Sequence, residues 1–346
     1  MKAAVLEGRG LLAIREVPTP EPAAGEVLLE VRASAVCGSD IHRFTRGHRT
    51  YPMILGHEAA GVIRAVGAGA DPALVGRSAA LVPLVPCHAC AECLAGRYSA
   101  CGSYTFIGSR RAGALAEFVA APARNVLLLP DDLPFEAAAL IEPSTVARHM
   151  LDLGGFAGGQ SAIVFGAGSI GLMLVQWLRV LGASPIIATD VVDTNLDAAR
   201  ALGAHVTLNP TRDDVPAEVR RRTGAGVDLA LEAAGSPAAL AQAIEATRPR
   251  GSIVLGGNQP TDASLPMAFI ESLMRRELSI TGCFMSYSAP WPGHEWTDGL
   301  AAALDGGLDM AAMISHRAPL AEAPAIFAAI GERRLVHRKV VFDPTA

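Results

Sequence analysis

The chain has 346 residues, of which 51% are hydrophobic and 18% charged, and its formal net charge is −5. This length exceeds what one hydrophobic core usually supports, so we expect two domains, and the composition excludes a disordered or fibrous protein. No basic stripe offsets the negative charge, so the sequence predicts a small-molecule partner and no nucleic acid.

Residues 1–20 alternate between strand-like and turn-like stretches and lack the blocks of a secretory signal peptide. The longest apolar stretch, 162–189, is broken by glycines and carries Arg179, so we predict no membrane contact. We therefore expect a cytoplasmic protein. Its six cysteines are then reduced, and we interpret them as metal ligands or buried thiols.

Up to about residue 145 the chain consists of short β-like runs separated by glycine and proline, which predicts an irregular, mostly β domain. The clearest runs are 27–31, 59–66 and 79–83. From residue 161 strands alternate with helices, which predicts an α/β fold with a doubly wound parallel sheet. The expected strands are 162–165, 185–189, 227–232, 252–255 and 278–281, and the first two helices are 170–181 and 194–202.

After residue 283 the chain becomes irregular again and ends in an alanine-rich helical stretch and a strand at 338–342. This order predicts a split domain. Residues 1–145 and 284–346 would form a catalytic domain around an inserted domain, 146–283, with the active site in the cleft where the two meet.

Two groups of potential metal ligands precede residue 146. Cys37 lies in V-C-G-S-D-I-H, His57 and Glu58 lie in G-H-E-A-A-G, and Glu142 adds a further carboxylate. A mixed sulfur, nitrogen and oxygen set with an exchangeable position suits a catalytic zinc, although each residue alone is a weak signal because a lone Cys or His is usually core or surface.

The second group is the C-x2-C-x2-C-x7-C run formed by Cys87, Cys90, Cys93 and Cys101. Two-residue gaps let thiolates converge on one tetrahedral ion, and four thiolates leave no position for substrate. The run therefore predicts a structural zinc site. Disulfides or unrelated loop cysteines are the alternatives, and a reduced compartment and the spacing disfavour them.

A glycine fingerprint follows the strand at 162–165. Gly166, Gly168, Ser169, Ile170 and Gly171 form G-A-G-S-I-G at the start of a helix, the context that a dinucleotide site requires. Asp190 ends the next strand, where a carboxylate binds the adenosine ribose, and Val191, Val192 and Asp193 follow it. A 2′-phosphate would meet acidic charge and no cationic partner there, so we predict NAD as the cofactor and not NADP. The alternative is that Asp190 only caps a turn.

The segment Gly56–Gly67 matches G-H-E-x2-G-x5-G, the signature of the zinc-containing medium-chain dehydrogenases, and the cysteine run and glycine fingerprint follow in that family's order. The chain resembles this family over essentially its whole length. The resemblance implies a GroES-like catalytic domain with two zinc sites, a Rossmann NAD-binding domain, and oxidation of an alcohol with NAD. It also implies a homodimer or homotetramer, formed by pairing of edge strands.

Glutamate at position 142, where many family members have cysteine, resembles the polyol branch. Zinc in that branch is held by Cys, His and one or both glutamates, so the direct ligand, Glu58 or Glu142, stays open. The resemblance also implies that Ser39 and His42 form a hydroxyl–imidazole proton relay and that Glu58 belongs to the catalytic site. The alternative is that Ser39 caps a short helix and His42 is merely exposed.

Segments 106–111 and 286–296 resemble family members that oxidise a secondary alcohol of a phosphorylated hexitol. Candidate phosphate partners are Arg43, Arg46, His48, Arg110 and Arg111, and surface charge or ion pairing is the alternative role for each. We expect oxidation of a polyol or polyol phosphate to a ketose or ketose phosphate. The alternatives are a free polyol, an amino alcohol such as threonine, a sugar acid, or a non-catalytic dinucleotide-binding protein.

Overall fold

The computed structural model describes residues 1–258 and 266–346, and every predicted site residue lies within these ranges. The chain divides into two compact units. The split unit consists of Met1–Glu142, Tyr287–Leu304 and Met310–Ala346, and the inserted unit consists of Pro143–Ser286 and Asp305–Asp309. The domain limits predicted from the sequence, 1–145 with 284–346 and 146–283, stay a prediction.

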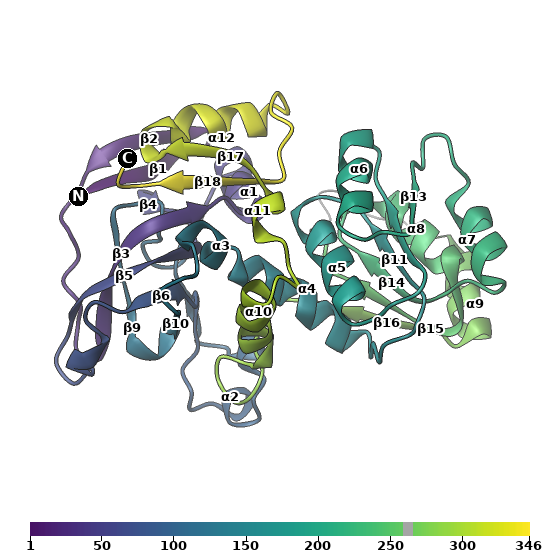
Figure 1. The fold of residues 1–346 in the computed structure, drawn as a ribbon, viewed down its shortest axis with the longest axis horizontal. Helices are drawn as coiled ribbons and strands as arrows, with labels where there is room; N and C mark the ends of the chain where they lie inside the picture. Colours follow the sequence, from purple (N-terminus) through teal and green to yellow (C-terminus); the bar gives the residue numbers. More distant parts are fainter. Residues whose placement is uncertain (259–265) are drawn as a thin grey trace. The chain divides into compact units, whose positions relative to one another are not determined.

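The split unit is built on β structure, and the predicted irregular β domain is confirmed (Figure 1). Its main sheet has seven strands in the order β10-β6-β5-β3-β18-β17, with β9 also pairing with β3, and smaller sheets have the orders β2-β1-β4 and β7-β8. The strands are β1 (Lys2–Gly8), β2 (Leu11–Glu16), β3 (Glu26–Ala35), β4 (Met53–Ile54), β5 (Glu58–Val66), β6 (Ser78–Leu81), β7 (Leu84–Val85), β8 (Thr105–Phe106), β9 (Phe118–Pro122), β10 (Val126–Leu128), β17 (Ile314–Pro319) and β18 (Lys339–Asp343).

Short helices connect these strands, and α4 (Ile141–Leu153) carries the chain into the inserted unit. The others in the split unit are α1 (Gly38–Arg46), α2 (Ala91–Leu94), α3 (Phe135–Ala139), α10 (His294–Leu304), α11 (Met310–Met313) and α12 (Ala323–Gly331). Phe44 of α1 meets Phe327 of α12 edge-on, with 5.8 Å between ring centroids, in a core that also contains residues of β1 and β18. This packing fixes α1, which follows Cys37 directly.

Strand register brings distant segments together in the split unit. Ala35, at the end of β3, pairs with Glu58 of β5 on one side and with Val341 of β18 on the other. Because side chains near such pairs lie a few ångströms apart, the register places Cys37, His57 and Lys339 in one neighbourhood.

The inserted unit contains a six-stranded sheet in the order β13-β12-β11-β14-β15-β16, and every neighbouring pair is parallel. This is the strand order of a dinucleotide-binding doubly wound fold, so the predicted Rossmann class is confirmed. The strands are β11 (Ala162–Phe165), β12 (Ile186–Thr189), β13 (Val206–Leu208), β14 (Val227–Glu232), β15 (Thr247–Leu255) and β16 (Ser279–Gly282). The helices are α5 (Ser169–Val180), α6 (Asp193–Ala201), α7 (Val215–Thr223), α8 (Pro237–Ala246) and α9 (Met267–Arg276).

Helices cover both faces of this sheet (Figure 1). One face packs Ile163, Ile187 and Ile253 against side chains of α7, α8 and α9 in a single buried cluster, while α5 and α6 lie on the other face. The central strands β11 and β12 are almost entirely apolar and fully buried because both of their faces are covered. In the described residues no helix is both long and apolar enough to cross a membrane.

Candidate active site and zinc centres

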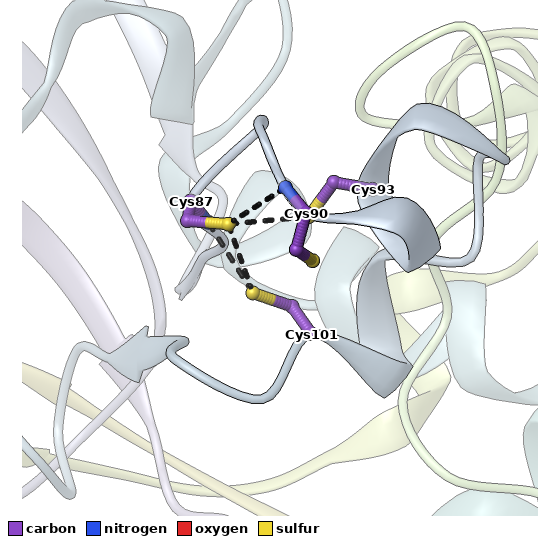
Figure 2. A group of neighbouring side chains, drawn as sticks. All are labelled: Cys87, Cys90, Cys93 and Cys101. Carbon is purple, nitrogen blue, oxygen red and sulfur yellow. Dashed lines mark hydrogen bonds between the residues drawn. The ribbon is translucent and has the colours of Figure 1, made fainter.

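Four cysteine sulfurs converge in the loop between β7 and β8 (Figure 2). Cys87 Sγ lies 3.9 Å from Cys93 Sγ and 3.6 Å from Cys101 Sγ, and with Cys90 all four sulfurs lie within 4.8 Å of one another. Sulfurs about 2.3 Å from a tetrahedral zinc lie about 3.8 Å apart, whereas a disulfide needs about 2.0 Å. The cluster therefore fits a closed zinc site with four thiolate ligands.

The surroundings of Cys87 favour the form of cysteine that binds metal. A hydrogen bond from the backbone N–H of Ala89, assisted by the hydroxyl of Ser103, lowers the pKa of the Cys87 thiol to about 6. A thiol with that pKa is largely thiolate at neutral pH, and thiolate is the ligand for zinc.

Aromatic packing holds the cysteine lobe, residues 84–106, against the segment at 287–296. The Trp291 ring stacks on Tyr287 with centroids 5.3 Å apart and meets the rings of His88 and Tyr98 edge-on at 5.1 and 5.0 Å. Trp296 is fully buried. These tryptophans therefore serve as packing residues of the split unit.

Cys37, His57 and Glu58 present ligand atoms within 4.8 Å of one another. Cys37 is the N-cap of α1, and its sulfur accepts the backbone N–H of Ser39 at 3.5 Å. His57 and Glu58 are buried where the chain enters β5. The cluster thus arises from a helix start and a strand start that the sheet register brings together.

Asp40 lies next to two members of this cluster, Cys37 and His57. It is fully buried, its Oδ2 accepts the backbone N–H of Cys37 at 3.3 Å, and its Oδ1 lies 3.6 Å from Nδ1 of His57. Burial raises the pKa of Asp40, but His57 and Arg43 outweigh burial and hold this pKa below its usual range. A carboxylate facing Nδ1 leaves the other ring nitrogen, Nε2, for a metal ion.

The donor set fits zinc. Cys37, His57 and Glu58 offer one sulfur, one imidazole nitrogen and one carboxylate oxygen within 4.8 Å of one another. Burial lowers the pKa of His57, yet the charges of Asp40 and Cys37 raise it well above its usual range. A site that favours positive charge and offers sulfur, nitrogen and oxygen donors suits a divalent cation of the zinc type.

Lys339 neutralises Glu58. Its Nζ lies 2.5 and 2.6 Å from the two carboxylate oxygens of Glu58 and 3.3 Å from the carbonyl oxygen of Val36, and both side chains of the pair are buried. Both oxygens of Glu58 are therefore engaged by an ammonium group. Glu142, in the first turn of α4, is outside the group of converging ligand atoms, and burial raises its pKa to about 7.

The two predicted relay residues, Ser39 and His42, both lie on α1, and in the part of the chain that the structure describes no hydrogen bond joins them. The Ser39 hydroxyl donates to Cys37 Sγ at 3.3 Å and accepts from Arg43 Nη1 at 2.8 Å. His42 is half-buried, and burial together with the charges of Arg46 and Arg43 lowers its pKa. The helix cap is Cys37 and not Ser39, so the capping alternative for Ser39 does not describe this helix.

The glycine fingerprint forms the turn between β11 and α5. Gly166 has a φ of +90°, and a Cβ on Gly171 would lie 1.7 Å from the Gly166 carbonyl oxygen, so both positions require glycine. A cavity of about 450 Å³ is lined by residues including Gly166, Gly168 and Asp190. Ser169, Ile170 and Gly171 form the first turn of α5, whose N-cap is Gly168.

Asp190 ties the glycine turn to the next strand. Its Oδ2 accepts the backbone N–H of Ala167, and its Oδ1 that of Val192, each at 2.8 Å. Nearby, Arg212 pairs with Asp193 at 2.6 Å and lowers the pKa of Asp193 to about 2. The sequence reasoning missed this arginine, which comes from the loop after β13, but Asp193 occupies its guanidinium.

Comparisons with known proteins identify the family. Residues 23–131 match the alcohol dehydrogenase GroES-like domain, and residues 169–302 match the zinc-binding dehydrogenase model. The chain is 38% identical to galactitol 1-phosphate 5-dehydrogenase of Escherichia coli (strain K12) over 325 residues, 92% of both chains. It is 36% identical to sorbitol dehydrogenase of Bacillus subtilis (strain 168) over 299 residues, 84% of both chains.

A crystal structure of galactitol-1-phosphate dehydrogenase from Escherichia coli superposes with a TM-score of 0.94 at 36% identity, covering 99% of this chain and 100% of the other. The chain belongs to the zinc-binding alcohol and polyol dehydrogenase family and is an oxidoreductase. The family resemblance noted in the sequence is thereby confirmed.

Proposed function

We propose that this protein oxidises a secondary alcohol of a polyol or polyol phosphate with NAD and yields a ketose or ketose phosphate. The observation that carries the proposal is the cluster of Cys37, His57 and Glu58, with Asp40 behind it. Zinc, when bound there, supplies Lewis acidity that lowers the pKa of a bound alcohol. A mixed donor set with room for substrate suits this task, and the four-cysteine site does not.

In this proposal Cys37 and His57 hold the ion, and a carboxylate, Glu58 or Glu142, completes the set. Asp40 orients His57 and the backbone of Cys37. The Ser39 hydroxyl, in contact with Cys37 Sγ, would accept the alcohol proton, and His42, on the same helix, would pass it to solvent. The lowered pKa of His42 keeps its ring neutral near pH 7, and a neutral ring can accept a proton.

The substrate class rests on two relatives, one named for a phosphorylated hexitol and one for sorbitol. NADH formation by zinc-loaded protein should be compared for galactitol 1-phosphate, galactitol, sorbitol and threonine. We expect kcat/KM for the phosphate ester to exceed that for galactitol by about 100-fold, on the order of 3 kcal/mol. Better turnover of sorbitol would support the second candidate, a free-polyol dehydrogenase, and turnover of none of them would refute the substrate class.

We propose NAD as the coenzyme because Asp190 lines the 450 Å³ cavity together with the glycine turn and Asp193 pairs with Arg212. Replacing Asp190 with glycine removes the carboxylate that would bind the ribose and repel a 2′-phosphate. We predict that Asp190→Gly lowers the ratio of kcat/KM for NAD to that for NADP by at least about tenfold. Asp197→Asn, on the exposed side of α6, is the matched control, and an unchanged ratio in Asp190→Gly would show this account of selectivity to be wrong.

Asp40 provides a test of the catalytic zinc set. Asp40→Asn keeps the shape of the side chain but removes the charge that faces His57 Nδ1, and such outer partners contribute about 10–100-fold in metal affinity. We predict that a chelator removes one of the two zinc ions from Asp40→Asn at correspondingly lower concentration, while the other stays bound. The same chelator midpoint in the variant and the parent protein would contradict the role given to Asp40.

We also propose that the protein forms a homodimer or homotetramer through the open edge of the six-stranded sheet. β16 is one of its two edge strands; Ile280 in β16 is 38% exposed, and Phe284, two residues after β16, is 61% exposed. Exposed apolar edge strands are templates for pairing, and a charge on them blocks it. We predict that Ile280→Glu/Phe284→Glu lowers the mass measured by light scattering to that of a monomer, whereas Val180→Glu, at another exposed apolar residue of this unit, leaves the mass unchanged.

A further inference from the structure

A cavity of about 560 Å³ in the split unit has a strongly cationic lining. Its walls come from α1, the loop after α1 and the residues on either side of β8. Among the described residues they are Arg43, Gly47, His48, Arg49, Thr50, Tyr104, Ser109 and Arg110. Three guanidinium groups and an imidazole thus share one cavity whose described lining contains no carboxylate.

The guanidinium of Arg110 is held in place by Tyr104 and keeps unused N–H donors. It lies over the Tyr104 ring, with 3.8 Å from its central carbon to the ring centroid, and Nη1 donates to the Tyr104 carbonyl oxygen at 2.7 Å. Arginine has five N–H donors, so most remain available to a ligand. Arg49 is exposed and pairs with no carboxylate in residues 1–258 and 266–346.

Not every arginine near the cavity belongs to its lining. Arg111, next to Arg110, donates to Glu26 at 2.8 Å and to the Ala120 carbonyl oxygen at 3.1 Å, and it does not line the cavity. Arg46, on α1, also lies outside the lining. Of the arginines in this part of the chain, Arg43, Arg49 and Arg110 line the cavity.

Arg43 links the cavity to the metal cluster. It lines the cavity, and its Nη1 donates to the Ser39 hydroxyl at 2.8 Å and to Asp40 Oδ1 at 3.4 Å, so its other N–H groups are the ones left for a ligand. The Ser39 hydroxyl in turn contacts Cys37 Sγ at 3.3 Å. Arg43 is therefore two hydrogen bonds from Cys37 of the metal cluster, and a ligand group bound to Arg43 would be three. Arg43 thus borders both the cavity and the metal cluster, as one ligand with its anionic end in the cavity and its hydroxyl group at the metal would require.

We propose that this cavity is a phosphate subsite, in which Arg43, Arg49 and Arg110 bind the phosphate monoester of a phosphorylated polyol. The inference rests on the proposed function and makes it specific. Planar guanidinium groups bind phosphate oxygens in pairs, through hydrogen bonds stronger than those between neutral groups. The subsite explains selection of a phosphate ester over a free polyol by residues outside the metal cluster.

The test uses the zinc-loaded full chain and two measurements. Binding of inorganic phosphate is followed by calorimetry, and kcat/KM is measured for galactitol 1-phosphate and for galactitol. Arg49→Gln/Arg110→Gln should weaken phosphate binding by at least about tenfold and lower the ratio of the two kcat/KM values by a similar factor. Arg46→Gln removes the same charge from α1 outside the cavity, and it should leave both quantities unchanged.

The outcomes separate the subsite from the proposed function. A parent protein that prefers galactitol 1-phosphate, together with a double variant that keeps this preference, would overturn the subsite and leave the proposed function standing. Equal losses of phosphate binding in Arg46→Gln and in the double variant would also overturn the subsite. Such losses would show that phosphate responds to the overall positive charge and not to contact with these arginines. A parent protein that turns over both polyols equally would refute the phosphorylated substrate itself.

Discussion

Replacing Lys339 with methionine should destabilise the protein by about 3–5 kcal/mol, because it leaves the Glu58 carboxylate buried without its counter-ion. Both Glu58 oxygens contact Lys339 Nζ, and Cys37 and Glu142 add negative charge around the same ammonium group. Chemical denaturation of chelator-treated protein measures the cost without compensation by zinc.

A double-mutant cycle separates the pair from simple loss of packing. Lys339→Met/Glu58→Gln removes both charges and should recover most of the stability lost in Lys339→Met, since neutral groups of similar shape cost little to bury in place of an ion pair. If the losses of the two single variants simply add in the double variant, the ion pair is not the source of the effect.

Cys93→Ser should remove one zinc per chain and release the cysteine lobe, residues 84–106. The lobe's regular structure is one four-residue helix, a three-residue 3-10 turn and a pair of two-residue strands, so it has little other support. Structural zinc contributes about 10–16 kcal/mol to small domains that fold around it. Here we expect local unfolding, detected as rapid proteolysis within the lobe while the inserted unit stays resistant.

Trp291 supplies an independent measurement of this change. Its ring contacts His88 and Tyr98 of the lobe, so release of the lobe should alter its fluorescence. Cys283→Ser is the matched control, because the Cys283 thiol belongs to neither metal cluster and lies 3.7 Å from the Met285 carbonyl oxygen. If Cys93→Ser retains two zinc ions and resists protease like Cys283→Ser, the four-cysteine zinc assignment is wrong.

Much of the fold could be predicted because its signals are local. The turn at Gly166, the strand before it and the helix after it all depend on residues a few positions apart, and the structure has them within one or two residues of the prediction. β15 was predicted from residue 252 but begins at Thr247. Pro249 and Arg250, which has a φ of +61°, interrupt the strand pattern there, and the pairing with β14 continues past a register shift.

In the site, too, local motifs could be predicted from the sequence, and contacts between distant residues could not. The cysteine run and the G-H-E segment are compact motifs, whereas the roles of Asp40 and Lys339 depend on partners brought near by the sheet. Asp40 stands beside predicted residues, but only the fold shows that it faces His57, 17 positions later along the chain. Lys339 is 281 residues from Glu58, and no local pattern marks it.

The position of Lys339 also bears on synthesis. The ribosome makes Cys37, His57 and Glu58 early, then the whole inserted unit, and only afterwards the strand β18 that begins at Lys339. Until β18 adds to β3, the nascent chain exposes an anionic ligand cluster without its ammonium partner. The charge balance of the metal cluster is therefore completed only once Lys339 has been made and β18 has paired with β3.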